Sequence, residues 1–255
     1  MNQATACGIG ALGSIRVPWP EIAHLRKNPP EPGLKPLIRM SDELTVLAVA
    51  AVQNAIDQAG WNDRSFEDFG LLAGARYFGR VRFANNLERW RHAQVHGQSP
   101  MTVPHLSLHA IAGTVSIAFR IQGPHFAISG NPGLIAEGLL MGMGMLHEMS
   151  LPGLWVVFSE WDLEPNAQSE PVDSVGQSLA IALVPNSFAT PWVLQLQPGD
   201  FSAAEECRVA DLIEGFQPEC PGEMSCPVPG LGSFFFLPQL VPNLVPSVAF
   251  PGAVH

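Results

Sequence analysis

The clearest periodic pattern in the chain lies near its amino terminus. Apolar residues recur at every third or fourth position from Leu44 to Ala59, which is the spacing of one face of an α-helix. Ser41 precedes this run as a candidate helix cap, and Gly60 follows it as a stop signal. The pattern predicts an amphipathic helix over residues 41–59.

Short apolar runs bounded by glycine, proline or polar residues predict buried strands. They occupy residues 4–12, 69–75, 125–129, 153–158, 179–184 and 192–196. Segments of helical pattern lie between most of them, at residues 80–97, 106–119, 134–148 and 201–214. This alternation predicts an α/β fold with a mostly parallel central sheet flanked by helices.

Three glycines interrupt the helical segment at residues 134–148, namely Gly138, Gly142 and Gly144. Each weakens a helix by about 1 kcal/mol relative to alanine. Their presence predicts close backbone contact between this helix and a neighbouring element.

Proline marks two further segments. Four prolines between residues 29 and 36 argue against regular helix there and predict an extended surface connection. From residue 215 onward eight more prolines accompany apolar clusters such as FFFL, which predicts a segment extended over the body of the protein. We therefore expect an amino-terminal domain, residues 1–214, and a Pro-rich tail, residues 215–255, packed on it.

Composition and charge restrict the class of protein. Of the 255 residues 47% are hydrophobic and 14% are charged, as in a globular domain with a large core. Thirteen basic residues against 23 acidic ones give a formal net charge of −10, which argues against nucleic acid or an anionic membrane as the partner. The longest apolar stretch, residues 134–146, is too short to span a bilayer, and the first residues lack the pattern of a signal peptide. We expect a cytoplasmic protein without a membrane span.

Cysteine and histidine spacing gives little sign of metal chemistry. The four cysteines form no CxxC pair, so neither a zinc site nor a disulfide framework is indicated. His92 and His96 stand four residues apart, as do His105 and His109, but no third ligand is fixed beside either pair. A structural role is the favoured interpretation, and we expect no metal and no cofactor.

The order of four segments carries a family resemblance. They read ACGIGALG at residues 6–13, MSDELTVLAVAAVQNAIDQAGW at 40–61, DFGLLAGA at 68–75 and SPMTVPHLSLHAIAGTVSIAFRIQGP at 99–124, the last being the most specific. In this order they resemble the amino-terminal half of a β-ketoacyl synthase of the thiolase-like superfamily, over about residues 4–186. The resemblance implies a thiolase-like half-fold and a place in fatty-acid or polyketide-type biosynthesis.

The resemblance fails at the nucleophile. An active synthase of this family carries a cysteine where this chain reads Ser129, Gly130, Asn131, Pro132 and Gly133. Its two catalytic histidines belong to a second half that has no counterpart among these residues. The resemblance therefore implies a pseudoenzyme similar to a chain length factor, which pairs with itself or with an active ketosynthase.

Two other functions remain open on the sequence. Ser129 could replace the cysteine, with His125 on the same strand face as the nearest histidine, and the chain would then be a thioester hydrolase or decarboxylase. The half-fold could also bind an acyl chain or another small molecule. Since the sequence fixes no base beside Ser129, a structural loop residue is the favoured interpretation.

Two groups of residues are candidates for contact with partners. In the family, the strand before the nucleophile and the preceding helix form the dimer interface, which the resemblance assigns here to His109, His125 and Phe126. Five arginines within 16 residues of an acidic chain could bind an acyl carrier protein, namely Arg76, Arg80, Arg82, Arg89 and Arg91. The alternative for the arginines is a solvated helix face.

Overall fold

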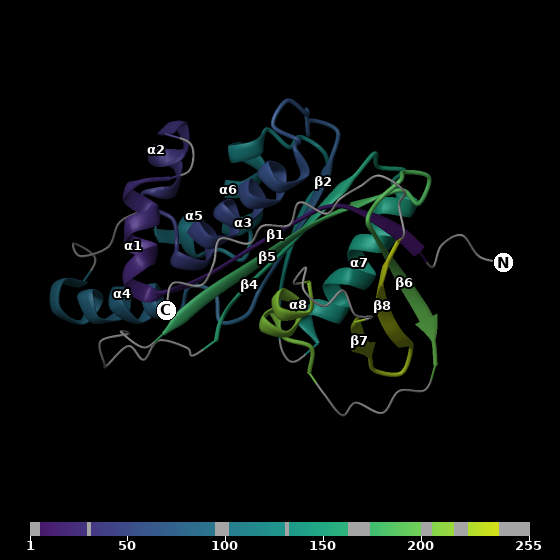
Figure 1. Ribbon diagram of the computed structural model, residues 1–255. Helices are drawn as coiled ribbons and strands as arrows, with labels where there is room; N and C mark the ends of the chain where they lie inside the picture. The colour runs from purple at the N-terminus through teal and green to yellow at the C-terminus, as the bar shows by residue number, and fades with distance from the viewer. Residues whose placement is uncertain are drawn as a thin grey trace.

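One eight-stranded sheet forms the centre of the molecule (Figure 1), with the strand order β3-β2-β4-β5-β1-β6-β8-β7. The computed structural model describes residues 6–29, 32–94, 102–130, 133–162, 174–199, 206–216 and 224–239. The strands are β1 (Ala6–Pro18), β2 (Gly70–Ala75), β3 (His125–Ser129), β4 (Leu154–Trp161), β5 (Val175–Val184), β6 (Trp192–Pro198), β7 (Met224–Val228) and β8 (Gly232–Pro238). The α-helices are α1 (Trp19–Lys27), α2 (Lys35–Ile38), α3 (Glu43–Ala59), α4 (Arg80–Ala93), α5 (Thr102–Leu106), α6 (Ala110–Phe119), α7 (Leu134–Glu148) and α8 (Val209–Gly215).

The strands run parallel on one side of the sheet only. β2 is parallel to both β3 and β4, whereas every other pairing, from β4 through to β7, is antiparallel. Helices separate β2, β3 and β4 along the chain, and parallel neighbours require such crossovers. No described helix separates β4 from β5, and these two strands pair as antiparallel neighbours. β5 and β6 run in the same direction on opposite sides of β1, because each is antiparallel to it. The predicted α/β fold is confirmed, but the prediction of a mostly parallel sheet is wrong.

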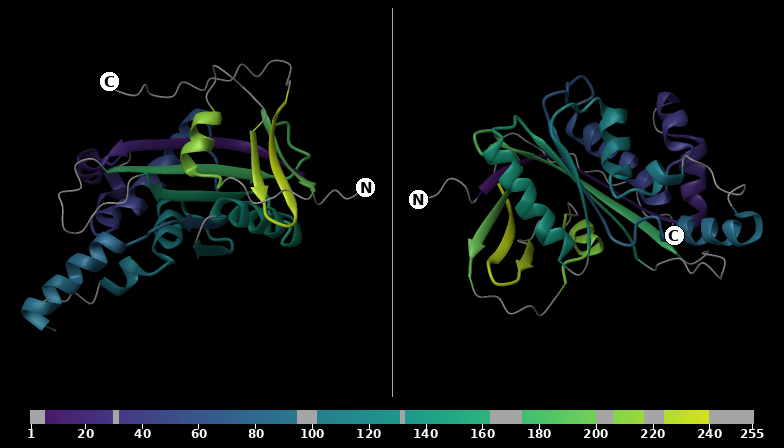
Figure 2. Two further views of the ribbon diagram at one scale, coloured as in Figure 1. Left: turned by 90° about the horizontal axis from the view of Figure 1, so that it is seen from below. Right: turned by 180° about the vertical axis from the view of Figure 1, so that it is seen from behind.

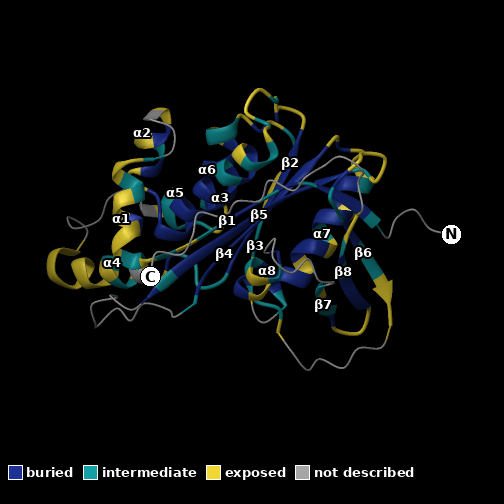
Figure 3. Ribbon diagram, in the orientation of Figure 1, coloured by how far each residue is buried: buried dark blue, intermediate teal, exposed yellow. Residues whose placement is uncertain are grey.

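Helices cover both faces of the sheet (Figure 2). α3 and α6 lie on one face and α7 and α8 on the other, so that two apolar cores form. Along β4, Trp155 and Val157 belong to the first core and Val156 and Phe158 to the second, as the alternation of a strand requires. Figure 3 shows the central strands buried along most of their length, which explains why they read as continuous apolar runs. None of the helices in the described residues is long and apolar enough to cross a membrane.

The first long helix, α3, begins later than the sequence predicts. Its cap is Asp42 and not Ser41, because the Asp42 Oδ1 atom accepts a hydrogen bond from the Leu44 N–H at 2.9 Å. The Ser41 hydroxyl instead donates to a carbonyl oxygen one turn earlier in the chain. Gly60 ends the helix with a φ of 66°, a left-handed conformation that suits glycine.

Two of the three glycines of α7 allow the helix to approach the sheet. A Cβ atom at Gly138 would lie 2.5 Å from the Phe158 ring, and one at Gly142 would lie 2.9 Å from Val156. Gly144 has nothing within 4 Å of the equivalent position. The predicted close contact is confirmed for Gly138 and Gly142 and is wrong for Gly144, which lies on the exposed side of the helix.

The proline-containing segment after β1 is largely helical. α1 follows β1 directly, and a 3₁₀ turn at Pro32–Leu34 leads into α2. Pro20 and Pro36 lie in the first turns of α1 and α2, where no helical hydrogen bond to the proline nitrogen is needed. The extended connection that the sequence predicts between residues 29 and 36 is therefore wrong for the described residues, because most of them are helical. Residues 30 and 31 lie outside the described residues.

The described carboxy-terminal segment extends the sheet. β6 pairs with β1, and β8 lies between β6 and β7. Phe234 and Phe236 of β8 are fully buried, and the Phe236 ring lies 5.2 Å from that of Phe216. For residues 224–239 the structure thus shows two paired strands where the sequence predicts an extended tail. The boundary predicted after residue 214 falls inside α8, and residues 217–223 and 240–255 lie outside the described residues.

Candidate functional site

β3 forms one edge of the sheet. It pairs with β2, from Leu71 opposite His125 to Ala75 opposite Ser129, and no described strand pairs with its other side. The backbone groups on that side are available to a further strand. Phe126 of this strand is 41% exposed. The edge is therefore a candidate surface for protein contact.

Two histidines come together beside the β3 edge. His109 immediately precedes α6, and its ring stacks on that of His125 with the centroids 5.0 Å apart. The Nδ1 atom of His125 donates to the Gly123 carbonyl oxygen at 3.2 Å. The structure thus brings His109, His125 and Phe126, the residues assigned to an interface by the resemblance, to one edge of the sheet.

Exposed apolar side chains continue from β3 onto neighbouring elements. Ile117 of α6 is 66% exposed and Val103 of α5 is 75% exposed, and Leu108 between these helices is also exposed. α6 contacts both β3 and α5. Large apolar side chains gathered in this way are typical of a surface that binds another protein.

Ser129 ends β3 at the carboxyl ends of the parallel strands. It lies opposite Ala75 of β2, which lies opposite Ser159 of β4. α7 begins soon after it, preceded by Gly133 with a φ of 112°. Ser129 and Gly130 are exposed, and no described residue forms a hydrogen bond with the Ser129 hydroxyl. Asn131 and Pro132 lie outside the described residues, and among the others no base is placed to activate Ser129.

Two of the described cysteines, Cys7 and Cys207, have thiols with strongly raised pKa values. Cys7 lies in β1, and burial raises the pKa of its thiol to about 12. A hydrogen bond with Cys226, together with burial, raises the pKa of the Cys207 thiol far above its ordinary value. Thiols with such pKa values stay protonated at neutral pH and are poor nucleophiles. Cys220 lies outside the described residues.

A buried carboxylate joins three elements near the same ends of the strands. The Oε1 atom of Glu160 in β4 accepts from Gln177 Nε2 at 2.8 Å and from the Val209 N–H of α8 at 3.1 Å. Burial raises the pKa of Glu160, while the bond from Gln177 and the charge of Arg208 act in the opposite direction. Glu160 thus fixes α8 on the sheet. The sequence alone does not indicate this contact, because Val209 is 49 residues away along the chain.

Two of the five arginines face inward. Arg76 follows β2 and forms an ion pair with Glu206. Arg82 of α4 donates to the Met40 carbonyl oxygen at 2.7 Å, and its Nε atom lies 3.8 Å from Glu43 Oε2. Each guanidinium group binds another part of this chain. The two groups therefore do not form one positive surface for a partner.

The other three arginines lie along α4. Arg80 at its beginning stacks on the Tyr77 ring, with the guanidinium carbon 4.2 Å from the ring centroid. Arg89 and Arg91 lie on the exposed second half of the helix, where Arg91 is 3.5 Å from Glu88. The arginines that are adjacent in the sequence therefore do not form a single patch.

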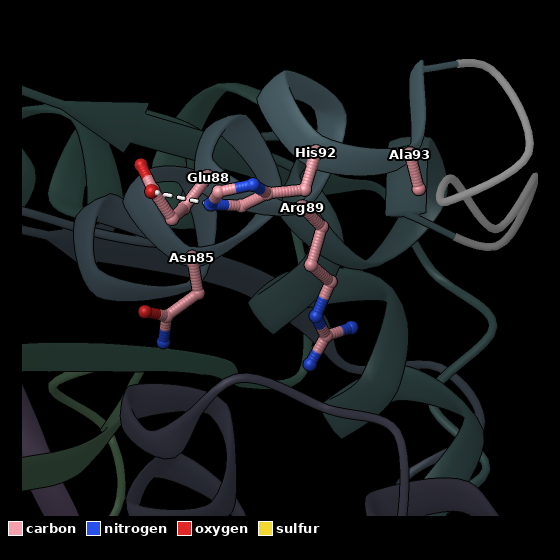
Figure 4. Close-up of a pocket in the computed structure, with 5 residues that line it drawn as sticks. All are labelled: Asn85, Glu88, Arg89, His92 and Ala93. Carbon is pink, nitrogen blue, oxygen red and sulfur yellow. Dashed lines mark hydrogen bonds and ion pairs between the residues drawn. The ribbon is translucent and has the colours of Figure 1, made fainter.

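Figure 4 shows an open depression on α4, lined by Asn85, Glu88, Arg89, His92 and Ala93. The His92 Nε2 atom lies 3.1 Å from Glu88 Oε1. Because all the lining residues belong to one helix, no other element among the described residues encloses a ligand there. His96 lies outside the described residues, and within the described part of the chain no three His, Cys, Asp or Glu side chains gather as a metal site would require.

Comparison with known proteins agrees with the fold. Residues 33–131 match the family model described as the N-terminal domain of β-ketoacyl synthase. The ketosynthase (ApeO) in complex with its chain length factor (ApeC) from Xenorhabdus doucetiae superposes with a TM-score of 0.57 at 13% identity, covering 92% of this chain and 99% of that chain.

Two further structures are similar. The ishigamide ketosynthase/chain length factor matches with a TM-score of 0.54 at 13% identity, over 76% of this chain and 67% of that chain. A type II polyketide synthase acyl-carrier protein in complex with its ketosynthase matches with a TM-score of 0.57 at 13% identity, over 76% and 70%. The chain therefore has the fold of ketosynthases and chain length factors, and its residues 33–131 are similar to the N-terminal domain of β-ketoacyl synthases.

Proposed function

We propose that the chain is a non-catalytic ketosynthase-like subunit that binds an active ketosynthase in the cytoplasm, during polyketide-type or fatty-acid biosynthesis. The observation that carries this proposal is the open β3 edge, which holds the His109–His125 stack and the exposed Phe126 and is contacted by α6, the helix that carries the exposed Ile117. A strand of the partner can pair with β3, while apolar side chains of the partner cover the helices beside it.

The geometry around Ser129 supports a non-catalytic role. Condensation by this family needs a thiolate at the end of β3, and this chain has an exposed serine there with no described hydrogen-bond partner. Cys7 is held as a protonated thiol in a different part of the sheet. A hydrolase that used Ser129 would need a base in contact with it, and no described residue has that position.

The similar structures support the choice of partner. Two of them pair a ketosynthase with a chain length factor, and the Xenorhabdus doucetiae chain is matched over 99% of its length. A third is a complex of a ketosynthase with its acyl-carrier protein, so we include such a carrier as a second, transient partner of the assembled complex. Of the five arginines, Arg89 on the exposed part of α4 offers positive charge for that contact.

Co-expression with a ketosynthase tests the proposal. We expect a complex that survives size-exclusion chromatography, and we expect Ile117→Glu to weaken it at least tenfold because a charge would be buried at the interface. Leu231→Glu is the matched control, since Leu231 is 53% exposed near the opposite edge of the sheet. Equal binding by both variants would contradict the β3 interface.

An activity assay separates this proposal from the hydrolase alternative. The purified chain should not hydrolyse acyl-pantetheine substrates, and Ser129→Ala should leave any background rate unchanged. A rate that falls by several orders of magnitude in Ser129→Ala, with unaltered folding, would establish Ser129 as a nucleophile.

A further inference from the structure

The helix α4 leaves the body of the protein. It starts from Gly79, whose left-handed φ of 69° turns the chain after β2, and its far end projects away from the other elements in the left view of Figure 2. Every residue from Leu87 to Gln94 is exposed. An isolated helix of this length is marginally stable in water, so its second half is expected to need a partner.

One side of this helix is apolar. Phe83, Leu87 and Trp90 follow each other at intervals of four and three residues, which places them on the same face. Each is between 49% and 58% exposed. A stripe of three large side chains including a tryptophan is typical of a helix that lies in a groove of another protein.

Contacts at the first turns of α4 fix the direction of the helix. Arg82 connects it to the Met40 carbonyl oxygen, which lies before α3, and to Glu43 at the start of α3. Leu106 of α5 lies against Gly79. A second arginine, Arg26 of α1, donates to Glu43 Oε1 at 2.7 Å from the other side. These contacts hold the first turns of α4 in place, while the apolar stripe extends beyond them.

The charge of the helix suggests the chemistry of the groove. α4 contains four arginines and one glutamate, whereas the whole chain has 23 acidic and 13 basic residues. Arg91 lies next to the apolar stripe on the helix surface, one residue after Trp90. A complementary surface would be an apolar groove with acidic residues on its rim.

The direction of α4 relates it to the β3 edge. In the left view of Figure 2, α4 projects beyond the sheet on the side opposite β1, which is the side that β3 closes. A five-residue strand spans only about 17 Å, which is too little for the roughly 1,600 Å² that a stable interface buries. A partner docked at β3 therefore needs further contact area, and α4 offers it on the same side of the molecule.

We propose that α4 is an arm that lies along the ketosynthase docked at the β3 edge and inserts Phe83, Leu87 and Trp90 into an apolar groove with an acidic rim on that subunit. This inference rests on the proposed function, and it adds a second contact region, separate from β3, that determines how tightly the two subunits hold each other.

A charge-matched pair of double variants tests the arm. Leu87→Glu with Trp90→Glu changes the apolar stripe, while Asn85→Glu with Ala93→Glu adds the same charge to other faces of the same helix. All four side chains are exposed, so both proteins should retain the melting temperature and circular dichroism of the parent. We expect the first pair to weaken binding to the ketosynthase at least tenfold and the second by less than threefold. Similar effects of the two pairs would overturn the proposal.

Ile117→Glu distinguishes a failure of the arm from a failure of the proposed function. If Ile117→Glu prevents binding while the Leu87 and Trp90 pair binds like the parent, the arm is refuted and the β3 interface stands. If the parent chain does not bind a ketosynthase at all, the proposed function fails first. If the parent chain alone forms a dimer that only the Leu87 and Trp90 pair dissociates, the arm serves a second copy, which overturns the assignment to a ketosynthase.

Photo-crosslinking identifies the occupant directly. A benzophenone-bearing phenylalanine analogue at position 90, compared with the same analogue at position 85, should give a crosslink to the ketosynthase from position 90 only. A crosslink from position 90 to an acyl carrier protein, or to a second copy of this chain, would overturn the proposal.

Discussion

The buried cap of α3 predicts that stability falls as the pH rises. Asp42 is only 3% exposed, and its carboxyl lies beside Glu43. Burial, followed by the charge of Glu43, raises the pKa of Asp42 from 3.8 to about 7, although the hydrogen bond from Leu44 and the charge of Arg82 act in the opposite direction. Between about pH 4 and pH 7 the folded protein therefore holds a proton at Asp42 that the unfolded chain has released.

The sign and size of the effect follow from proton linkage. Because the folded state binds more protons in this window, the free energy of unfolding decreases as the pH rises through it. Each pH unit of difference between the two pKa values corresponds to about 1.4 kcal/mol, so Asp42 costs the folded protein up to about 4 kcal/mol by pH 8 relative to pH 4. That is a large share of the roughly 5–15 kcal/mol by which domains are stable.

Asp42→Asn removes this titration and keeps the cap, because an asparagine oxygen can also accept the Leu44 N–H. Urea unfolding at several pH values between 4 and 8 measures the free energy of unfolding of both proteins, and contributions from groups that do not interact with Asp42 cancel in the difference. We expect the variant to gain stability over the parent steadily up to about pH 7 and to keep that gain above it. Asp42→Ser also supplies a capping oxygen without a carboxyl group, so it should show the same pH-dependent difference. A flat difference for both variants would refute the reasoning.

Three further predictions concern packing and chemistry. Gly138→Ala should destabilise the protein by about 1–3 kcal/mol because its Cβ would meet the buried Phe158, whereas Gly144→Ala should stabilise it by up to about 1 kcal/mol; thermal melts compare the two, and equal effects would contradict the packing of α7. Phe236→Ala should cost about 3–5 kcal/mol in urea unfolding, and a loss below about 1 kcal/mol would mean that β8 is not part of the core. A cysteine-directed acyl analogue should leave the intact mass unchanged at neutral pH, and an adduct mapped to residues 125–135 would contradict the non-catalytic assignment.

Local sequence pattern was sufficient for the elements whose apolar periodicity is strong. The helix predicted at residues 134–148 has the bounds of α7, and the strand predicted at residues 125–129 has those of β3. The resemblance also predicts that the family's nucleophile position falls directly after that strand, where this chain has the exposed Ser129. In these cases the information lies within a few turns of helix or one strand.

The direction and order of the strands depended on contacts between distant parts of the chain. β1 lies between β5 and β6, about 170 residues away, and nothing in its sequence identifies these neighbours. The predicted alternation of strand and helix applied to β2, β3 and β4 but not to β4 and β5, which are joined without a described helix and pair antiparallel. The phenylalanines of β8 likewise read as an apolar cluster, and only their pairing with β6 made them part of the sheet.

The charged residues likewise separate what the sequence determines from what the tertiary structure decides. Five arginines are neighbours in the sequence, but ion pairing depends on which acidic groups the fold brings within a few ångströms. Arg76 meets Glu206 and Arg82 meets Glu43 through tertiary packing alone, so these two face inward while Arg89 and Arg91 remain on the exposed end of α4. The amphipathic pattern of α4 was determined by the sequence. That Phe83, Leu87 and Trp90 of this pattern remain about half exposed was decided only by the tertiary structure.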